Sequence, residues 1–201
     1  MAKQGKETLQ NRLAWAKAVT NFRGHQYDGK VMTVHRAEDT KQAIHDELYE
    51  ILETNMRSMY EETWGWDAKV KRAQMEHPDA RFLVVREASE SEEGKEKEIL
   101  AFSHFRFTVD DDDDPKDTCL YIYELQVKMG ATGKGLGKKM MEALEEIAHQ
   151  YEMSRCMLTV FKCNKGAMRF YMYHLNYQID PQSPSQWNQD ETYEILSKGV
   201  S

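Results

Sequence analysis

The stretch KMGATGKGLGKKMMEAL, residues 128–144, restricts the fold of this chain more than any other part of its sequence. Four glycines crowd a short loop, which follows the strand-like segment TCLYIYELQV (residues 118–127) and leads into an apolar, helix-like segment. Glycines at a strand-to-helix junction let successive backbone N–H groups and the positive end of the helix dipole bind an anion. The stretch therefore predicts an α/β fold with an anion-binding loop.

The remaining periodicity predicts a single α/β domain, with a mixed central sheet and helices on both faces. Apolar residues at helical spacing from Ile44 to Met59 indicate a long helix, and a strand–helix–strand crossover beside antiparallel strands makes a mixed sheet. The 201 residues, 40% of them hydrophobic, suffice for one core. The expected strands are 31–34, 81–87, 98–109, 118–127, 156–161, 177–180 and 192–197; the expected helices are 41–62, 67–77, 135–151 and 165–175. A helix at 9–22 would belong to an N-terminal segment, 1–30, that packs on a domain formed by residues 31–201.

The charge balance favours a basic partner over nucleic acid. Lys and Arg number 27 against 34 Asp and Glu, a formal net charge of −7, so we expect no direct nucleic-acid site. No apolar run is long enough to cross a bilayer, and the N-terminus is too polar for a secretory signal, which predicts a protein of the nucleus and cytoplasm without membrane contact. Cys119, Cys156 and Cys163 fit no metal-ligand spacing, so we expect reduced core cysteines and no metal.

Three phosphate-binding patterns compete for the glycine loop. A P-loop would need glycine where Thr132 stands and Ser or Thr where Lys139 stands. A dinucleotide-binding loop would need glycine in place of Met140. The third pattern, x-x-x-G-x-G, fits residues 132–137 and would bind a pyrophosphate through backbone N–H groups. A mobile surface loop without a ligand remains the alternative if the loop is considered alone.

This third pattern resembles motif A of the GCN5-related N-acetyltransferase (GNAT) superfamily, in which the loop binds acetyl-CoA. A second segment, Asn164-x-x-Ala167-x-x-Phe170-Tyr171, follows the strand-like MLTVF and resembles motif B of that superfamily. There the Asn reaches the pantetheine and the aromatic residue lies near the CoA sulfur. Thr132 stands where the superfamily usually has Arg or Gln, so a side-chain contact to phosphate is in doubt while the backbone contacts remain. The resemblance implies that acetyl-CoA is the acetyl donor and that it is bound by Leu125, Gln126, Val127, Thr132, Gly133, Lys134, Gly135, Leu136, Gly137, Lys138, Asn164 and Phe170.

Further segments resemble the branch of that superfamily that acetylates the N-termini of histones. They are NMRSMYEETWGW (55–66), AFSHFRF (101–107), LYIYELQV (120–127), MLTVFKCNKGA (157–167) and, near the C-terminus, SPS and TYEILS. The resemblance implies an N-terminal acetyltransferase whose partners are the tails of histone four and histone two-A, which begin Ser-Gly-Arg-Gly. A ribosomal partner and the oligomeric state stay open.

Glu124 is the candidate general base. An α-amine has a pKa of about 7.7–8.0 against about 10.4 for lysine, so a single carboxylate, directly or through one water, can deprotonate it. Tyr121 and Tyr123 share one face of the strand, and strict alternation would turn Glu124 to the other face. In this superfamily the strand is bulged and splays from its neighbour, which would re-aim Glu124 and free N–H groups near Leu125–Val127 to polarise the acetyl carbonyl. The alternative is a Glu on a solvated strand face.

The remaining catalytic and substrate-binding candidates come from the resembling segments. Tyr123 would lie beside the reacting amine, and Tyr171 would protonate the leaving thiolate, unless it is a core aromatic. The residues expected to bind the peptide are Tyr60, Trp64, Thr108, Asp110, Tyr121, Ser183 and Tyr193. Trp64 is one residue closer to Tyr60 than in the family, and Thr108 stands where the family has an acidic residue. Simple packing of WGW and simple solvation of the acidic run 110–114 are the alternatives.

Two other functions are compatible with this sequence. The same scaffold could acetylate lysine side chains or small amines, which an assay of an N-terminally blocked peptide would reveal. The chain could also bind CoA or histone tails without catalysis, although Glu124, Tyr123 and Asn164 are all present.

Overall fold

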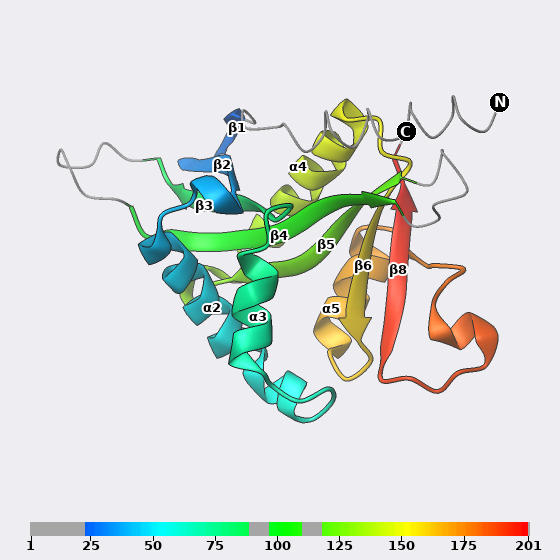
Figure 1. Cartoon of the computed structure of the whole chain (residues 1–201). Coiled ribbons are helices and arrows are strands. Elements are labelled where there is room, and N and C mark those ends of the chain that lie inside the picture. The colour runs from blue at the N-terminus through cyan, green and yellow to red at the C-terminus, as the bar shows by residue number, and fades with distance from the viewer. Residues whose placement is uncertain (1–22, 89–96, 110–117, 201) are drawn as a thin grey trace.

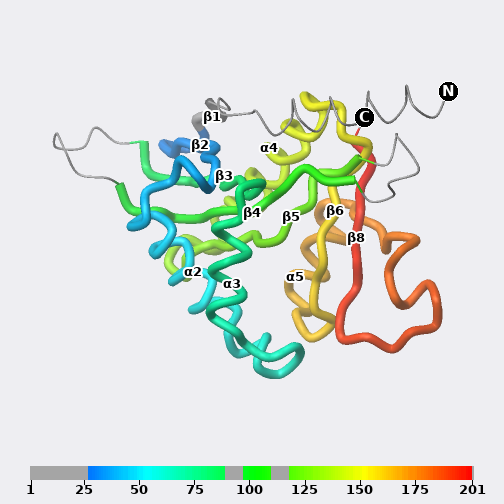
Figure 2. Tube along the Cα trace, in the orientation of Figure 1, coloured from blue at the N-terminus to red at the C-terminus, as the bar shows by residue number. Residues whose placement is uncertain are grey.

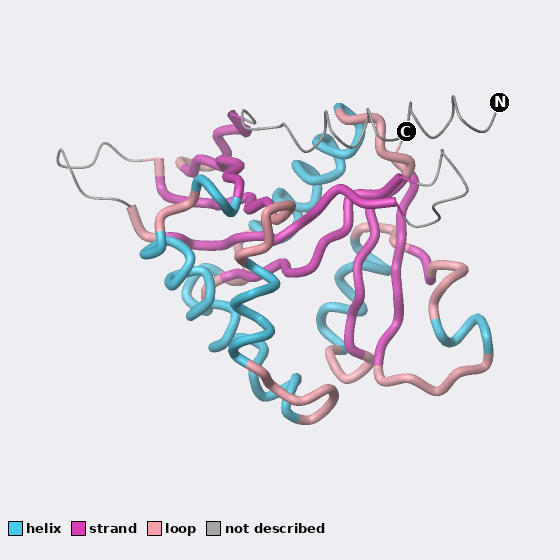
Figure 3. The backbone as a smooth tube through the Cα atoms, in the orientation of Figure 1, coloured by secondary structure: helices cyan, strands magenta, loops and turns pink. Residues whose placement is uncertain are grey.

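The computed structural model describes residues 23–88, 97–109 and 118–200. Within these ranges, eight strands form one sheet in the order β1-β2-β3-β4-β5-β6-β8-β7 (Figures 1 and 3). The strands are β1 (Arg23–Tyr27), β2 (Lys30–Arg36), β3 (Arg81–Glu87), β4 (Ile99–Val109), β5 (Thr118–Val127), β6 (Arg155–Phe161), β7 (Gln178–Ile179) and β8 (Tyr193–Gly199). The α-helices are α2 (Gln42–Glu61), α3 (Ala68–Met75), α4 (Leu136–Gln150) and α5 (Lys165–Arg169). A π-helical turn, Phe170–His174, continues α5, and short 3-10 turns cover Ala37–Asp39, Met129–Ala131 and Pro184–Trp187.

The sheet is mixed, as the sequence predicts. Strands β5 and β6 run parallel and are joined through α4, whereas every other pair of neighbouring strands is antiparallel. A parallel pair needs a crossover connection, and the residues of α4 supply it. The α/β single-domain class is confirmed.

Helices cover both faces of the sheet, α2 and α3 one face and α4 and α5 the other (Figure 1). Alternate residues of β3 serve the two layers: Phe82 and Val84 pack toward α2, and Leu83 and Val85 pack toward α4. A central strand buried on both faces reads as a continuous apolar run, which RFLVV is. Each such fully buried side chain contributes about 1.5–3 kcal/mol relative to exposure.

The connection between α2 and α3 is a tight turn held by local chemistry. The carbonyl of Tyr60 accepts a hydrogen bond from the Gly65 N–H at 2.7 Å, and Gly65 has φ +83°, a left-handed value that glycine adopts readily. Asp67 then caps α3, because its carboxylate accepts hydrogen bonds from the N–H groups of Lys69 and Val70. This turn fixes where the side chains of α3 meet the sheet.

Strand β5 carries a bulge and then separates from β6. His104 of β4 pairs with Glu124, but Phe105 pairs with Ile122, so Tyr123 is an extra residue on β5. Pairing of β5 with β6 ends at Ile122 and Leu158. Beyond that point the two strands diverge, as Figure 2 shows. The superfamily resemblance implied both features, and both are present.

The structure bears on several further expectations from the sequence. Strand β1 was missed, although Asp28-Gly29 between β1 and β2 is a strong hairpin signal, and both residues have positive φ. Residues 30 and 31 both belong to β2, and the division into an N-terminal segment and a domain stays a prediction. The helix expected at 9–22 lies outside the described residues. Cys119 and Cys156 are buried as expected, but Cys163 is exposed and so is not a core cysteine. The helix expected over 165–175 is present as α5 and its π-helical continuation.

None of the helices in the described ranges is long and apolar enough to cross a membrane. Nor do the His, Cys, Asp and Glu side chains of those ranges gather into a group that could hold a metal ion.

Candidate active site

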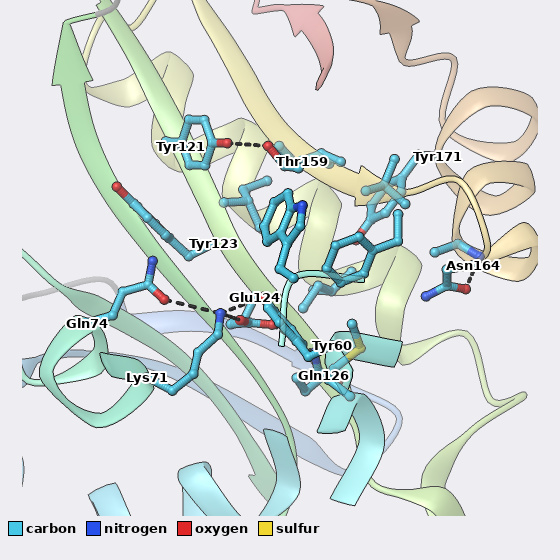
Figure 4. A pocket seen from close by; sticks show the side chains of 18 residues that line it. Tyr60, Lys71, Gln74, Tyr121, Tyr123, Glu124, Gln126, Thr159, Asn164 and Tyr171 are labelled. Carbon is cyan, nitrogen blue, oxygen red and sulfur yellow. Dashed lines mark hydrogen bonds and ion pairs between the residues drawn. The ribbon is translucent and has the colours of Figure 1, made fainter. Parts of the chain in front are cut away.

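A cavity of about 280 Å³ opens where β5 and β6 diverge, between the end of α2, α3 and the start of α5 (Figure 4). It is the place where segments far apart in the sequence meet. Its lining residues are Met56, Tyr60, Trp64, Lys71, Gln74, Tyr121, Ile122, Tyr123, Glu124, Leu125, Gln126, Leu158, Thr159, Val160, Phe161, Asn164, Ala167 and Tyr171.

Glu124 lies in this cavity and is 5% exposed. Because Tyr123 is the bulged residue, Tyr123 and Glu124 both face the α2–α3 side, whereas Leu125 packs toward the α4 core. One carboxylate oxygen of Glu124 accepts a hydrogen bond from Lys71 Nζ at 3.1 Å, and the other accepts one from Gln126 Nε2 at 3.0 Å. The Glu124 carbonyl accepts a further bond from the Ser103 hydroxyl at 2.8 Å. The side chain is thus held by named donors and aimed into the cavity, and the solvated-face alternative is excluded.

Lys71 of α3 is the main feature that sequence analysis missed. Its ammonium donates to Glu124, to Gln74 Oε1 at 3.2 Å and to the Tyr60 hydroxyl, and it lies 4.1 Å from the centroid of the Tyr60 ring. The Lys71 side chain is only 12% exposed. Its position four residues before the buried Met75, on the same face of α3, is the signal that could have found it.

Aromatic rings form one wall of the cavity. Phe161 lies 5.0 Å from the Tyr60 ring and 4.8 Å from Trp64, and Trp64 in turn contacts Tyr193 at 5.1 Å between centroids. Trp64 lines the cavity and is 51% exposed, so it forms the rim. Burial, with the negative charge of Glu124 adding to it, raises the pKa of Tyr60 far above its usual value. The Tyr60 hydroxyl therefore stays protonated at any physiological pH.

The facing wall is built on β4 and β5. Tyr121 and Tyr123 lie 4.9 Å apart, and the Tyr121 hydroxyl shares a 2.5 Å hydrogen bond with Thr159. The Tyr123 ring stacks on His104 at 4.8 Å between centroids, and the Arg106 guanidinium lies 4.6 Å from its centroid. Burial, with the positive charge of Arg106 adding to it, lowers the pKa of His104 well below its usual value, so the imidazole is neutral. Tyr123 is therefore fixed by stacking.

The glycine loop has the geometry of an anion-binding site. Gly133 and Gly135 have φ +74° and +77°, and α4 begins at the next residue, Leu136. Among the described residues, none accepts a hydrogen bond from the backbone N–H groups of 133–138. Thr132 turns its hydroxyl back to the Met129 carbonyl. These unpaired donors fit the pyrophosphate of acetyl-CoA, which the backbone would bind without help from the Thr132 side chain.

Two of the motif B residues, Asn164 and Tyr171, line the cavity, whereas Phe170 does not. Asn164 lines the cavity, and its side-chain oxygen caps α5 by accepting from the Ala167 N–H at 3.0 Å. Phe170 lies outside the cavity and packs on Gly137, where an added Cβ would lie 3.4 Å from its ring. Tyr171 is buried in the π-helical turn and lines the cavity. Burial, with the charge of Glu124 adding to it, raises the pKa of Tyr171 well above its usual value, so its phenol keeps a proton.

Several expected site residues lie elsewhere. Ser183 is fully buried away from the cavity, and its hydroxyl donates to Glu194 at 2.6 Å. Thr108 and Tyr193 do not line the cavity either, although Tyr193 contacts Trp64 and pairs with Phe161, which do. Val127 packs toward the core, and its carbonyl accepts from Asn55 at 3.1 Å. Asp110 lies outside the described residues.

Comparison with known proteins assigns the class of this fold and site. Residues 45–177 match the Acetyltransferase (GNAT) family, so the chain belongs to that family. It is an acetyltransferase that uses acetyl-CoA, and the glycine loop described above fits that donor.

One similarity to an individual protein is in sequence, and two others are in structure. The spermine/spermidine N(1)-acetyltransferase of Bacillus subtilis is 26% identical over 124 residues, which are 57% of this chain and 82% of that protein. Arabidopsis thaliana NAA60, solved with a bisubstrate analogue, superposes with a TM-score of 0.61 at 12% identity, covering 85% of this chain and 99% of the other. A chain of the NatC complex bound to Gag peptide and CoA gives a TM-score of 0.59 at 11% identity, with the same coverages. At such identities the two structures establish the fold alone.

Proposed function

We propose that the protein is an N-terminal acetyltransferase of the NatD type, which transfers the acetyl group of acetyl-CoA to the α-amine of histone four and histone two-A. The observation that carries the proposal is the position of Glu124: a buried carboxylate inside an aromatic-walled cavity, beside the diverging end of β5. Glu124, Gln74 and Tyr60 already bind one ammonium group there, that of Lys71. An acceptor amine would use the same oxygens.

Acetyl-CoA supplies a thioester whose carbonyl carbon is attacked by the acceptor nitrogen. Glu124 takes the proton of that nitrogen, directly or through a water. The edge of β5 at residues 123–127 is not paired with β6, so its backbone N–H groups are placed to polarise a carbonyl. Tyr171 lies in the same cavity and is the candidate proton donor to the departing thiolate. Tyr123 fixes the position of the amine by its stacked ring.

The walls of the cavity support a narrow, N-terminal substrate. Tyr60, Trp64 and Phe161 form an edge-to-face cluster on one side, and Tyr121 and Tyr123 lie on the other. Such a slot suits the first two residues of a Ser-Gly-Arg-Gly tail, since both are small. We assign the arginine to the acidic run that begins at Asp110, on charge complementarity alone. Histone tails as partners place the enzyme, in this proposal, in the nucleus and cytoplasm, with an encounter at the ribosome as a further proposal.

A second candidate is the acetylation of a polyamine, which the similarity to the Bacillus subtilis enzyme favours. A polyamine carries several positive charges and needs several acceptors for them. Among the described residues that line the cavity, Glu124 is the one carboxylate, and the Lys71 ammonium already pairs with it. The positive charge of Lys71 would also repel a second ammonium group. The cavity therefore favours a peptide α-amine over a polyamine.

The test is an acetylation assay on a Ser-Gly-Arg-Gly peptide, the same peptide with a blocked N-terminus and an added lysine, and spermidine. We expect turnover of the first substrate at least about 100-fold above the other two, because at neutral pH α-amines are free base on the order of 100 times more often than alkyl amines. Equal turnover of the blocked peptide would make the protein a lysine acetyltransferase. Preferred turnover of spermidine would establish the polyamine activity instead.

A further inference from the structure

We propose that Lys71 is itself an acetylation substrate of this active site, so that in the absence of an acceptor the enzyme acetylates its own Lys71 ammonium group. The proposal rests on the role of Glu124 in the function proposed above, but not on the identity of the peptide. It adds a modification site on α3 and an internal competitor for the acceptor position.

The position of the Lys71 amine carries this inference. Nζ lies 3.1 Å from Glu124 Oε1, the oxygen that would accept a proton from an acceptor amine (Figure 4). Gln74 Oε1, the Tyr60 hydroxyl and the Tyr60 ring complete its surroundings. A carboxylate, a neutral carbonyl, a hydroxyl and an aromatic face are together what an ammonium group binds. Of the described residues that line the cavity, Lys71 is the one that carries a primary amine.

A purely structural role for Lys71 is the alternative, since the ion pair also ties α3 to β5. A lysine whose only role is this ion pair needs no access to the acetyl donor. Lys71, however, shares its cavity with Asn164 at the start of α5, with Tyr171 in the π-helical turn after it, and with the end of β5 that β6 does not pair. The proposed function places the thioester of the donor beside these elements, so the amine and the acetyl group would meet in the same cavity.

The chemical step balances without an added reagent other than acetyl-CoA. The Lys71 ammonium first gives one proton to solvent, and the lone pair of the neutral Nζ forms a C–N bond to the acetyl carbon. Nζ then loses a second proton to Glu124. The C–S bond of the thioester breaks, and the thiolate takes a proton from Tyr171 or from water. The products are Nζ-acetyl-Lys71, which is neutral, and CoA with a free thiol. Glu124 is thereby left without its cationic partner.

Two opposing effects set the expected rate. A lysine side chain is in general a stronger base than an α-amine, so it less often presents a neutral, nucleophilic nitrogen. An amine held beside its base gains from proximity, which in intramolecular reactions corresponds to an effective concentration of about 10⁵ M or more. We therefore expect acetylation of Lys71 to be slow relative to turnover of a good acceptor, and visible when no acceptor is present.

The experiment follows acetylation of each lysine by peptide mapping and mass spectrometry after incubation of the full-length protein with acetyl-CoA alone. Lys69 is the internal control, because it lies on the same helix, is exposed and makes no contact with the cavity. Spontaneous chemistry modifies exposed lysines first. We expect the reverse order, with Lys71 acetylated at least about ten times faster than Lys69, whereas equal rates or a faster Lys69 would overturn the proposal.

Two further measurements separate the possible causes. In Glu124→Gln the Lys71 rate should fall about 100-fold, the scale of general-base catalysis, while the Lys69 rate stays the same. In the wild-type protein a saturating Ser-Gly-Arg-Gly peptide should suppress acetylation of Lys71 but not of Lys69, and this result does not depend on how any variant folds. Failure of the first effect would overturn the inference, and so would failure of the second in a sample in which the peptide is itself acetylated.

Peptide turnover in the same wild-type sample distinguishes this inference from the proposed function. Acetylated peptide with unmodified Lys71 would overturn the inference and leave the function standing. Acetylated Lys71 with unmodified peptide would support the inference and overturn the histone assignment. If neither is acetylated, both are overturned.

Discussion

The two halves of the site differ in the groups that form them: backbone groups form one half, and side chains form the other. The half that we assign to the donor, the glycine loop and the end of β5, offers backbone: N–H groups at 133–138 and the strand edge at 123–127 that β6 does not pair. The half that we assign to the acceptor, α2, α3 and the front of β5, offers side chains, among them Tyr60, Lys71 and Glu124. Backbone donors can serve one donor molecule across a whole family, whereas the choice of acceptor depends on particular side chains. The two halves should therefore respond separately to mutation.

Glu124→Gln should give the largest difference between the effect on kcat and the effect on the affinity for CoA. The amide cannot accept the proton of the acceptor amine, so kcat should fall by about 10²–10⁴-fold. The affinity for CoA, measured by calorimetry, should stay within about twofold of wild type, because Glu124 belongs to the acceptor half. Unchanged kcat would remove Glu124 as the base, and a large loss of CoA affinity would show that the halves are not separate.

The reciprocal change is Gly135→Ala. At φ +77° an alanine is strained by about 1–2 kcal/mol, and the strain falls on the loop that presents the N–H groups. We expect the Kd for CoA to rise about tenfold, the equivalent of that strain, with KM for the acceptor peptide little changed. Gly130→Ala is the matched control, since Gly130 has no positive φ and open space around its Cβ position. Equal weakening by both variants would mean that the loop conformation does not determine donor binding.

A smaller effect in the acceptor half is expected for Trp64→Ala. Loss of ring contacts with Phe161 and Tyr193 should raise KM for the peptide about fivefold, since an aromatic pair contributes about 0.5–1.5 kcal/mol. Trp187→Ala is the control, because Trp187 is equally a surface tryptophan, 69% exposed, and does not line the cavity. Similar KM values for the two variants would mean that the WGW segment, residues 64–66, contributes to packing and not to peptide binding.

The smallest expected effect is on the pH dependence of the free energy of unfolding. It arises from His104, which stacks on Tyr123 of the acceptor half. Burial holds His104 neutral in the folded protein, whereas in the unfolded chain it takes up a proton below about pH 6.5. The contribution of His104 to the free energy of unfolding is therefore complete above that pH and is lost as the pH falls. His104→Phe keeps a ring against Tyr123 and should remove about 1 kcal/mol of the loss between pH 7 and pH 5.5, measured by denaturant unfolding. Parallel pH curves for the two proteins would contradict a neutral buried His104.

The difference between the halves also explains what the sequence could predict. The glycine loop and the fit of Thr118–Val127 to a strand depend on residues close together in the chain, and both match the structure. Glu124 was identified because a resemblance supplied the bulge, which alternation alone would not predict. Lys71 was missed because its contact with Glu124 spans 53 positions of sequence: its spacing from Met75 marks the buried face of α3 but does not name the partner. Ser183 was assigned to the substrate site because it lies in a resembling segment, yet it packs against Glu194.

The central claim is that the cavity around Glu124 directs the acetyl group to a peptide α-amine. It is tested most directly by one peptide that offers both kinds of amine, Ser-Gly-Arg-Gly-Lys, incubated with acetyl-CoA and the wild-type protein. Tandem mass spectrometry then locates the acetyl group. We predict that it is found on the N-terminal serine and that the lysine stays free. Acetyl on the lysine, or an unmodified peptide, would contradict the account.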